Sequence, residues 1–147
     1  MAVAIFPIQV RFYELDPYGH VNHSTYLQYF EAARVAWLGE IGQGLDVLQE
    51  GGIQLVVTAV ATRFVASALL NDKLTVDTVM VEAKRVRAQW AQHTWRGDEL
   101  IACQRINFAT VNLAGRPVRI PESLLEAMAG FQADDDLLRK ELPALAL

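Results

Sequence analysis

The stretch LDPYGHVNHSTYLQYFEAARVAWLGEIG, residues 15–42, runs from a tight polar turn into a long amphipathic helix. Asp, Pro and Gly stand at the first, second and fourth positions of DPYG, which favours a type I turn. Beyond the turn, bulky residues recur every three or four positions and predict one buried helical face. They are Tyr26, Phe30, Ala33, Trp37 and Ile41. Asn22 or Ser24 can cap the start of this helix. Gly39 or Gly42 can end it.

The segments on either side of this helix have the patterns of β-strands. Upstream, Ile8, Val10 and Phe12 alternate with polar neighbours, which predicts a strand over 8–15 with one buried face. Downstream, the β-branched and alternating segments 53–67 and 71–88 predict two long strands. Residues 89–121 predict a hairpin around RGDE and a second turn at LAGRP. A short helix is expected over 122–131.

This order predicts an α+β fold. About four long strands in series, joined by short turns, favour one antiparallel sheet. The apolar face of the single long helix must be covered, and a curved sheet wrapped around the helix covers it. We expect one domain over residues 1–130, followed by a tail over 131–147 that is either a further helical piece or frayed.

Length, net charge and cysteine content exclude several classes of protein. A chain of 147 residues suits one domain, and its net charge of −4 does not favour nucleic acid as a partner. The single cysteine, Cys103, excludes an internal disulfide framework and is expected to be a small core residue. The N-terminal segment has neither a basic leader nor a long apolar run, so we expect a cytoplasmic protein without a membrane span.

The turn and the start of the helix resemble the hotdog-fold acyl-CoA thioesterases of the 4-hydroxybenzoyl-CoA thioesterase group. That group carries a strand, then Asp-x-x-Gly, then a short link to a helix with a Tyr and a Tyr-Phe-Glu-like run. The matching residues here are Asp16, Gly19, His23, Tyr26 and the YFEAAR run at 29–34. GHVNH also resembles the matching loop of acyl-carrier-protein thioesterases.

The resemblance implies a hotdog fold and a thioesterase without a cofactor. It also implies a homodimer or homotetramer, with active sites at the subunit boundary. In the resembled family the backbone amide seven residues after the Asp polarises the thioester carbonyl, and that position here is His23. The His23 ring can also orient Asp16 or the carbonyl, as some relatives suggest.

The chemistry of thioester hydrolysis fits these residues independently. Asp16 can attack the thioester carbon or take a proton from water, and both roles stay open. Unpaired N–H groups at the helix start, near His23 to Thr25, can hold the negative charge that develops on the carbonyl oxygen. The leaving thiol has a reference pKa of about 8.5 and needs no strong acid. Gly19 lets the backbone approach the substrate.

We therefore predict two sets of site residues. The predicted catalytic residues are Asp16, His20 and His23. The predicted substrate-binding residues are Gly19, Ser24, Thr25, Tyr26, Arg85 and Arg87. His20 is either a second catalytic residue or a turn residue. Asp16 and the two histidines are too little evidence for a metal site, so we expect none.

A local excess of basic residues suggests how the carrier binds. Between residues 84 and 119 the chain has seven bases and two acids, so its local charge is 7 − 2 = +5. Strand alternation would place Arg85 and Arg87 on one face and Lys84 on the other, unless a bulge intervenes. This segment is either a phosphate site for coenzyme A or a solvated strand face.

Other readings remain open at this stage. A hotdog module that binds acyl thioesters without cleaving them would keep the acyl tunnel but would not need Asp16. A hotdog dehydratase or hydratase needs a catalytic His in a different helix context, which the histidines here do not match well. Tyr26 and Tyr29 are expected in the core or at an interface, and Glu31 is expected to be a buried, hydrogen-bonded residue or an interface residue.

Overall fold

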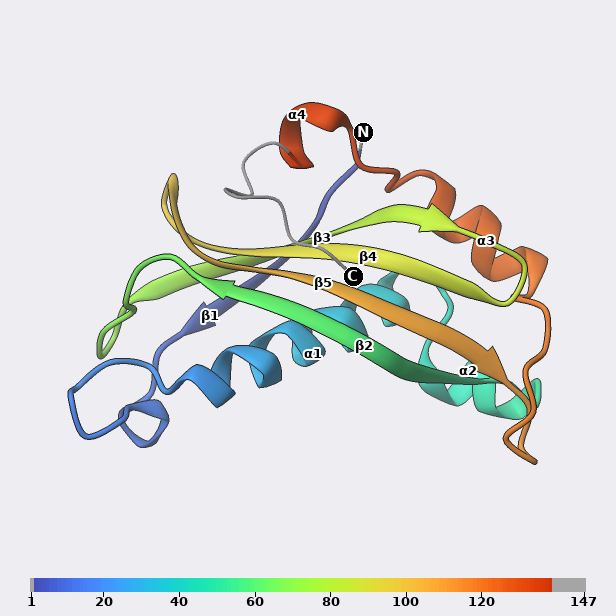
Figure 1. Cartoon of the computed structure of the whole chain (residues 1–147), viewed down its shortest axis with the longest axis horizontal. Helices are drawn as coiled ribbons and strands as arrows, with labels where there is room; N and C mark the ends of the chain where they lie inside the picture. Colours follow the sequence, from blue (N-terminus) through green and yellow to red (C-terminus); the bar gives the residue numbers. More distant parts are fainter. Residues whose placement is uncertain (1, 139–147) are drawn as a thin grey trace.

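The computed structural model describes residues 2–138, which build one five-stranded antiparallel sheet with a long helix across it (Figure 1). The strands are β1 (Ala4–Gln9), β2 (Gln54–Phe64), β3 (Lys73–Ala83), β4 (Arg87–Arg96) and β5 (Glu99–Val111), in the spatial order β1-β3-β4-β5-β2. The helices are η1 (Phe12–Glu14), α1 (His23–Glu40), α2 (Leu45–Glu50), α3 (Glu122–Ala129) and α4 (Asp135–Leu138). The predicted α+β architecture is confirmed.

Helix α1 forms where the apolar period changes from two to about 3.6. Asn22 caps it by accepting a hydrogen bond of 2.9 Å from the Ser24 backbone N–H. The helix ends at Glu40, and Gly42 follows with a φ of +74°, a left-handed conformation that glycine adopts readily. Of the predicted face, Tyr26, Phe30, Ala33 and Trp37 are buried, and Ile41 is half-buried against the core cluster that contains Trp37.

The strand predicted over 8–15 is wrong in its position. Strand β1 occupies Ala4–Gln9, and the chain then leaves the sheet and turns through η1. Phe12, expected on the buried face, has 76% of its side chain exposed. The turn forms because the buried Glu14 carboxylate accepts a hydrogen bond of 2.7 Å from the backbone N–H of Arg11, which a strand would instead use in its ladder.

The remaining strands confirm the predicted order. The β4–β5 hairpin turns at Gly97 and Asp98, within the predicted RGDE, and Gly97 has a φ of +62°. The LAGRP turn closes with an Asn112 N–H bond of 2.8 Å to the Arg116 carbonyl. Cys103 is fully buried, as expected for a small core residue. Helix α2 was not predicted.

The second face of the sheet is also covered. Val79 and Ala91 on this face pack against Ala133, Leu137 and Leu138. Of the tail predicted over 131–147, residues 135–138 form one helical turn, and residues 139–147 lie outside the described residues. Within residues 2–138, no helix has both the length and the apolar character needed to cross a membrane.

The two edges of the sheet differ in a way that bears on assembly. Strand β1 is six residues long and contains Pro7, which cannot donate a ladder hydrogen bond. Strand β2 is eleven residues long and contains no proline. Val56, Val57 and Val60 of β2 are each between 41% and 50% exposed. A long apolar edge of this kind is a template for pairing with another strand.

Candidate active site

Asp16 lies in a turn that fixes one oxygen of its carboxylate. The Asp16 Oδ1 accepts hydrogen bonds of 2.8 Å from the Tyr18 N–H and 3.2 Å from the His20 N–H. The Gly19 N–H donates to the Asp16 carbonyl at 3.1 Å, and Gly19 has a φ of +80°. Among residues 2–138, Oδ2 of Asp16 has no hydrogen-bond donor. One carboxylate oxygen therefore positions the group, and the other is available for chemistry.

Glu14 anchors this turn to helix α1. The Tyr29 hydroxyl donates a hydrogen bond of 2.8 Å to Glu14 Oε1, and the Asn22 N–H donates to the Glu14 carbonyl at 2.9 Å. Burial, together with the Glu14 carboxylate, raises the pKa of the Tyr29 phenol, so it stays a neutral donor. Tyr26 and Tyr29 are both buried, as predicted. The supporting role of Glu14 carried no signal in the sequence.

The start of helix α1 leaves one backbone donor free. The Ser24 N–H bonds the Asn22 side chain, and the Thr25 N–H bonds the Asn22 carbonyl at 2.9 Å. The N–H of His23, the first helical residue, has no acceptor within residues 2–138. The predicted set of donors near His23 to Thr25 thus reduces to His23. This N–H lies at the positive end of the helix dipole.

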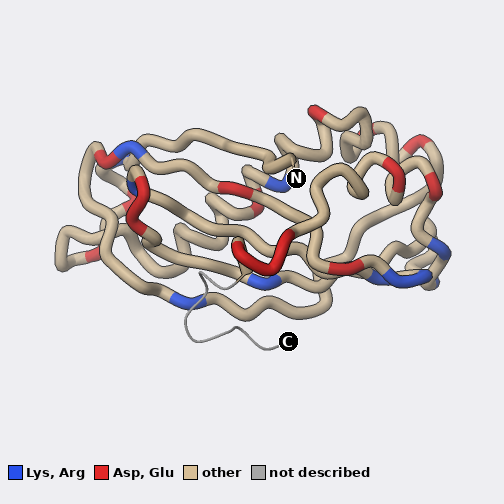
Figure 2. The backbone as a smooth tube through the Cα atoms, turned by 90° about the horizontal axis from the view of Figure 1, so that it is seen from above, with Lys and Arg blue, Asp and Glu red and all other residues tan. Residues whose placement is uncertain are grey.

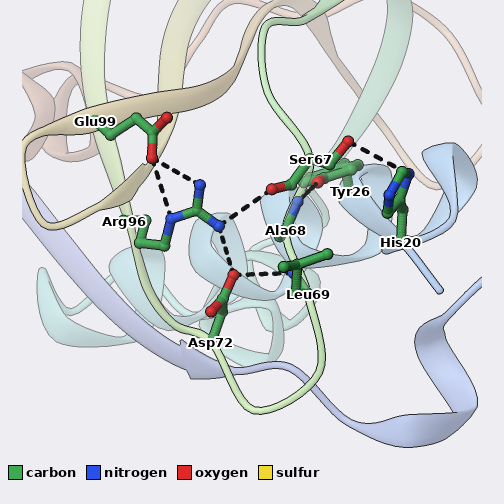
Figure 3. Close-up of polar contacts among 8 residues, drawn as sticks. All are labelled: His20, Tyr26, Ser67, Ala68, Leu69, Asp72, Arg96 and Glu99. Atoms are coloured by element: carbon green, nitrogen blue, oxygen red, sulfur yellow. Dashed lines mark hydrogen bonds and ion pairs between the residues drawn. The ribbon is translucent and has the colours of Figure 1, made fainter.

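The two histidine rings face different neighbours. The Nδ1 of His20 lies 3.4 Å from the Ser67 hydroxyl (Figure 3). The His23 ring meets Phe64 edge-on, with ring centroids 6.4 Å apart. No hydrogen bond or ion pair joins either ring to the Asp16 carboxylate within the described part of the chain. Among residues 2–138, no group of three or more His, Cys, Asp or Glu side chains is placed to hold a metal ion.

The loop over residues 65–72 forms a wall beside this turn. The Val21 N–H donates to the Ala68 carbonyl at 2.9 Å, and the Ala68 N–H donates to the Tyr26 hydroxyl at 3.3 Å. Burial raises the pKa of Tyr26 above its ordinary value, so its hydroxyl is neutral and accepts this bond. The backbone of His20 also bridges that of Leu69. The loop therefore contacts both the Asp16 turn and the start of α1.

Arg96 fastens this loop to the β4–β5 hairpin (Figure 3). Its NH1 donates to Asp72 Oδ2 at 2.6 Å and to the Ser67 carbonyl at 3.1 Å. Its Nε and NH2 both bond Glu99 Oε1. The Leu69 N–H and the Arg96 guanidinium hold the pKa of the Asp72 carboxyl below its ordinary value. Sequence reasoning missed this group because its members meet only in the folded chain.

The basic segment lies at the far end of the sheet from Asp16. Lys84 and Arg85 stand in the turn between β3 and β4, and Arg87 is the first residue of β4. Figure 2 shows basic residues gathered at the end that carries this turn, and Figure 1 shows the Asp16 turn at the other end. The predicted shared face of Arg85 and Arg87 is wrong, because Arg85 lies outside the strands. Instead, Lys84 and Arg87 line one surface hollow with Glu82 and Gln89.

A second hollow of ≈ 110 Å³ lies between α1, α2 and the start of β2. Its wall is mainly apolar and includes Leu38, Leu55, Val57, Trp90 and Phe108. Glu31 and Arg34 of α1 also line it. Glu31 was expected to be buried or at an interface, and its side chain is exposed in the chain. We refer to this hollow as the α1–β2 pocket.

Comparison with known proteins identifies the family. Residues 10–128 match the thioesterase-like superfamily. The chain belongs to this superfamily. The match spans the Asp16 turn, α1 and all of β2 to β5. The hotdog fold and the thioester-hydrolase class that the sequence predicted are thereby confirmed, while the 4-hydroxybenzoyl-CoA group is not singled out.

Individual thioesterases and a solved structure are also similar to this chain. The acyl-CoA thioesterase YbgC of Haemophilus influenzae is 29% identical over 124 residues, which are 83% of this chain and 91% of the relative. The chloroplastic acyl-acyl carrier protein thioesterase ATL3 of Arabidopsis thaliana is 27% identical over 131 residues, 88% of this chain and 69% of the relative. The crystal structure of a hypothetical protein from Aquifex aeolicus superposes with a TM-score of 0.81 at 27% identity, covering 84% of this chain and 98% of that one.

Proposed function

We propose that this protein hydrolyses thioesters of coenzyme A or acyl carrier protein to a free acid and a thiol, with Asp16 as the catalytic carboxylate. One observation carries the proposal: Asp16 Oδ1 is held by two backbone N–H groups, while Oδ2 is free and the His23 N–H nearby along the chain has no acceptor. The names of YbgC and ATL3 support the two carriers. A module that only binds acyl thioesters would not need this arrangement.

Asp16 has two balanced routes to the products. As a general base, Oδ2 takes a proton from water, and the water oxygen attacks the carbonyl carbon. As a nucleophile, Oδ2 attacks that carbon itself, and water then hydrolyses the mixed anhydride. In both routes the carbonyl oxygen gains negative charge that the His23 N–H stabilises, and the thiolate leaves and takes up a proton. Single turnover in ¹⁸O-water distinguishes the general-base route from a nucleophilic route in which water attacks the aspartyl carbonyl of the anhydride. That nucleophilic route leaves the label in Asp16 and returns unlabelled product acid, whereas the general-base route returns labelled acid.

The site is completed by a second copy of the chain in this proposal. Within one chain, the basic turn and Asp16 lie at opposite ends of the sheet (Figure 1). Two-fold pairing of the exposed β2 edges would be antiparallel, so the start of β2 in one subunit would lie beside the end of β2 in its partner. Phe64, which ends β2, touches the His23 ring. Such a dimer brings Asp16 of one subunit near the α1–β2 pocket of the other.

The strand register extends this argument to the carrier. Arg87 pairs with Ala109 of β5, and Ala109 pairs with Val56 near the start of β2. Arg87 thus lies two strands from the open edge, about 10 Å at the usual spacing between strands. The β2-paired dimer places this basic end beside the Asp16 end of the partner. Phosphates of the carrier at Lys84 and Arg87 would then serve a thioester at the partner's Asp16.

Replacing Asp16 tests the catalytic assignment. Asp16→Asn keeps the shape of the side chain in a partly exposed turn, so the fold and assembly should be retained. We expect thiol release from acyl-CoA to fall by about 10²–10⁴. An Asn variant that turns over at the wild-type rate would show that another group does the chemistry. Binding of acyl-CoA without thiol release by the wild-type protein would instead support the non-catalytic module.

Replacing an edge residue tests the dimer. Val60→Lys puts a charge on the exposed β2 edge, where it should block strand pairing. We expect a monomer by light scattering and a large loss of thioesterase activity, with the helical and strand content unchanged. Ile5→Lys on β1, a position that is 55% exposed, is the matched control and should leave the assembly intact. A dimer that survives Val60→Lys would place the interface elsewhere.

A further inference from the structure

The α1–β2 pocket contains hydrogen-bond donors without acceptors. The Arg34 guanidinium donates one bond, from NH1 to Gln92 Oε1 at 2.9 Å. Its other N–H groups have no acceptor within residues 2–138. Trp90, which is 3% exposed, lines the same pocket, and its buried Nε1–H also has no acceptor there. A buried donor such as the Trp90 N–H is normally paired, and leaving it unpaired costs about 1–3 kcal/mol.

Within one chain, the residues around Arg34 do not account for its charge. Gln92, its single partner, is fully buried and already donates from Nε2 to the Phe30 carbonyl and the Thr78 hydroxyl. A neutral side chain could serve this network as well. Burial lowers the pKa of Arg34 from its ordinary value, and the Glu31 carboxylate partly offsets this. A half-buried cation in a mainly apolar pocket is costly unless a ligand uses it.

The charge of Glu31 favours a hydroxyl over a carboxylate on the ligand. Glu31 and Arg34 both line the pocket but form no ion pair with each other, so the pocket wall offers both a donor and an acceptor. A carboxylate would be attracted by Arg34 and repelled by Glu31. A hydroxyl can accept from the guanidinium and donate to the carboxylate at the same time. An unsubstituted alkyl chain would leave both groups unpaired.

We propose that the α1–β2 pocket selects hydroxyl-substituted acyl groups, with Arg34 and Glu31 as the residues that recognise the hydroxyl. This deepens the proposed function and rests on it. Arg34 stands eleven residues after His23, about 16 Å along the axis of α1, so the pocket serves the thioester held by the partner subunit. The hollow of ≈ 110 Å³ is smaller than the ~150 Å³ cavity that holds benzene, so we expect it to take only the distal end of an acyl chain.

Three six-carbon thioesters test the proposal by steady-state kinetics. Hexanoyl-CoA, 6-hydroxyhexanoyl-CoA and hexanedioyl-CoA differ only at the distal carbon. We expect the wild-type protein to favour the hydroxyl substrate over hexanoyl-CoA by about 10- to 100-fold in kcat/KM, the range of a hydrogen bond to a charged group. Arg34→Met should remove this preference, so that the ratio of kcat/KM for 6-hydroxyhexanoyl-CoA to that for hexanoyl-CoA falls to about one. Glu31→Gln should raise kcat/KM for hexanedioyl-CoA.

Two further variants show whether a loss of substrate preference is specific to Arg34. Arg116→Met changes an exposed arginine outside the pocket and should preserve the preference. Arg34→Gln replaces Arg34→Met if the methionine variant does not fold. Equal kcat/KM for hexanoyl-CoA and 6-hydroxyhexanoyl-CoA in the wild-type protein, or an unchanged ratio in a folded Arg34 variant, would overturn the proposal.

Failure of the proposed function gives a different result. In that case none of the three substrates releases thiol. In that case, calorimetry measures the affinity of the α1–β2 pocket for two uncleavable thioethers, S-hexyl-CoA and S-(6-hydroxyhexyl)-CoA. Tighter binding of the hydroxyl compound by the wild-type protein, lost in Arg34→Met, supports the selection of a hydroxyl. Equal Kd values overturn it.

Discussion

Tyr29 donates a buried hydrogen bond of 2.8 Å to Glu14, and this bond joins the middle of helix α1 to the segment that carries Asp16. Glu14 is 8% exposed and lies two residues before Asp16. The same carboxylate oxygen accepts the Arg11 N–H. The position of the turn that carries Asp16 is therefore set by a contact between residues fifteen positions apart.

Tyr29→Phe should destabilise the protein and disturb the turn. The change leaves a buried carboxylate oxygen short of one donor, which costs about 1–3 kcal/mol. We expect a lower midpoint in urea and a reduced kcat, because Asp16 is less firmly placed. Tyr13→Phe removes a hydroxyl from a side chain that is 66% exposed and should change neither quantity. Equal stability of the two variants would contradict the anchoring role.

His23→Pro should remove the free backbone donor while keeping the helix. His23 is the first residue of α1, a position where proline is tolerated, and Asn22 has a ψ of 138° that suits a residue before proline. We expect kcat to fall by about 10²–10³, the effect of losing one oxyanion donor. His23→Ala keeps the N–H and should lose much less. If the alanine and proline variants are equally impaired, the ring rather than the N–H takes part.

Asp72→Asn should weaken the Arg96 clamp in a pH-dependent way. The folded-state pKa of Asp72 is depressed, so its stabilising effect is present above the ordinary pKa of about 3.9 and is lost as pH falls through the lower folded value. The wild-type protein should melt at a higher temperature than Asp72→Asn at pH 7. The difference should shrink below about pH 4. Asp98→Asn in the exposed β4–β5 turn is the control. If the difference in melting temperature between the wild-type protein and Asp72→Asn does not change with pH, the charge of Asp72 does not stabilise the Arg96 contact.

Reversing charge at Lys84 and Arg87 should raise KM for acyl-CoA with little change in kcat. These two residues line one hollow at the β3–β4 turn, whereas the neighbouring Arg85 does not line it. Arg85→Glu is therefore a matched control with the same change in net charge per site. The effect should decrease as salt rises. The wild-type protein and the Lys84/Arg87 variant should hydrolyse a small thioester without a nucleotide equally well. If the two proteins have the same KM for acyl-CoA, Lys84 and Arg87 do not bind the carrier.

The sequence predicted the elements whose determinants are local. The 16–19 turn follows from the conformational preferences of Asp, Pro and Gly, and α1 follows from an apolar period sustained over its full length. The β4–β5 hairpin has a Gly in its turn. The strand around residue 12 was misplaced because alternation alone does not show that the chain leaves the sheet after Gln9. The Glu14 carboxylate, which accepts the Arg11 N–H, turns the chain into η1 instead. Helix α2 has six residues, too few for a periodic signal.

The residues that hold the candidate site in place could not be predicted from local sequence patterns. Arg96, Asp72 and Ser67 lie up to 29 residues apart in the chain, and nothing in their local patterns distinguishes them from surface residues. Arg85 and Arg87 were given a common face by alternation, which fails because the turn between β3 and β4 begins after Ala83. The spatial order of the strands is likewise a property of long-range pairing.

Pro7 on strand β1 limits how large an assembly can become through strand pairing. When two copies join at β2, the outer strand at each end of the combined sheet is β1. That strand is short and has no N–H to donate at Pro7, so a third copy finds no matching edge. In the proposed dimer, growth into a fibre through strand pairing would therefore stop at two copies. Any tetramer has to associate through a sheet face or through the helices.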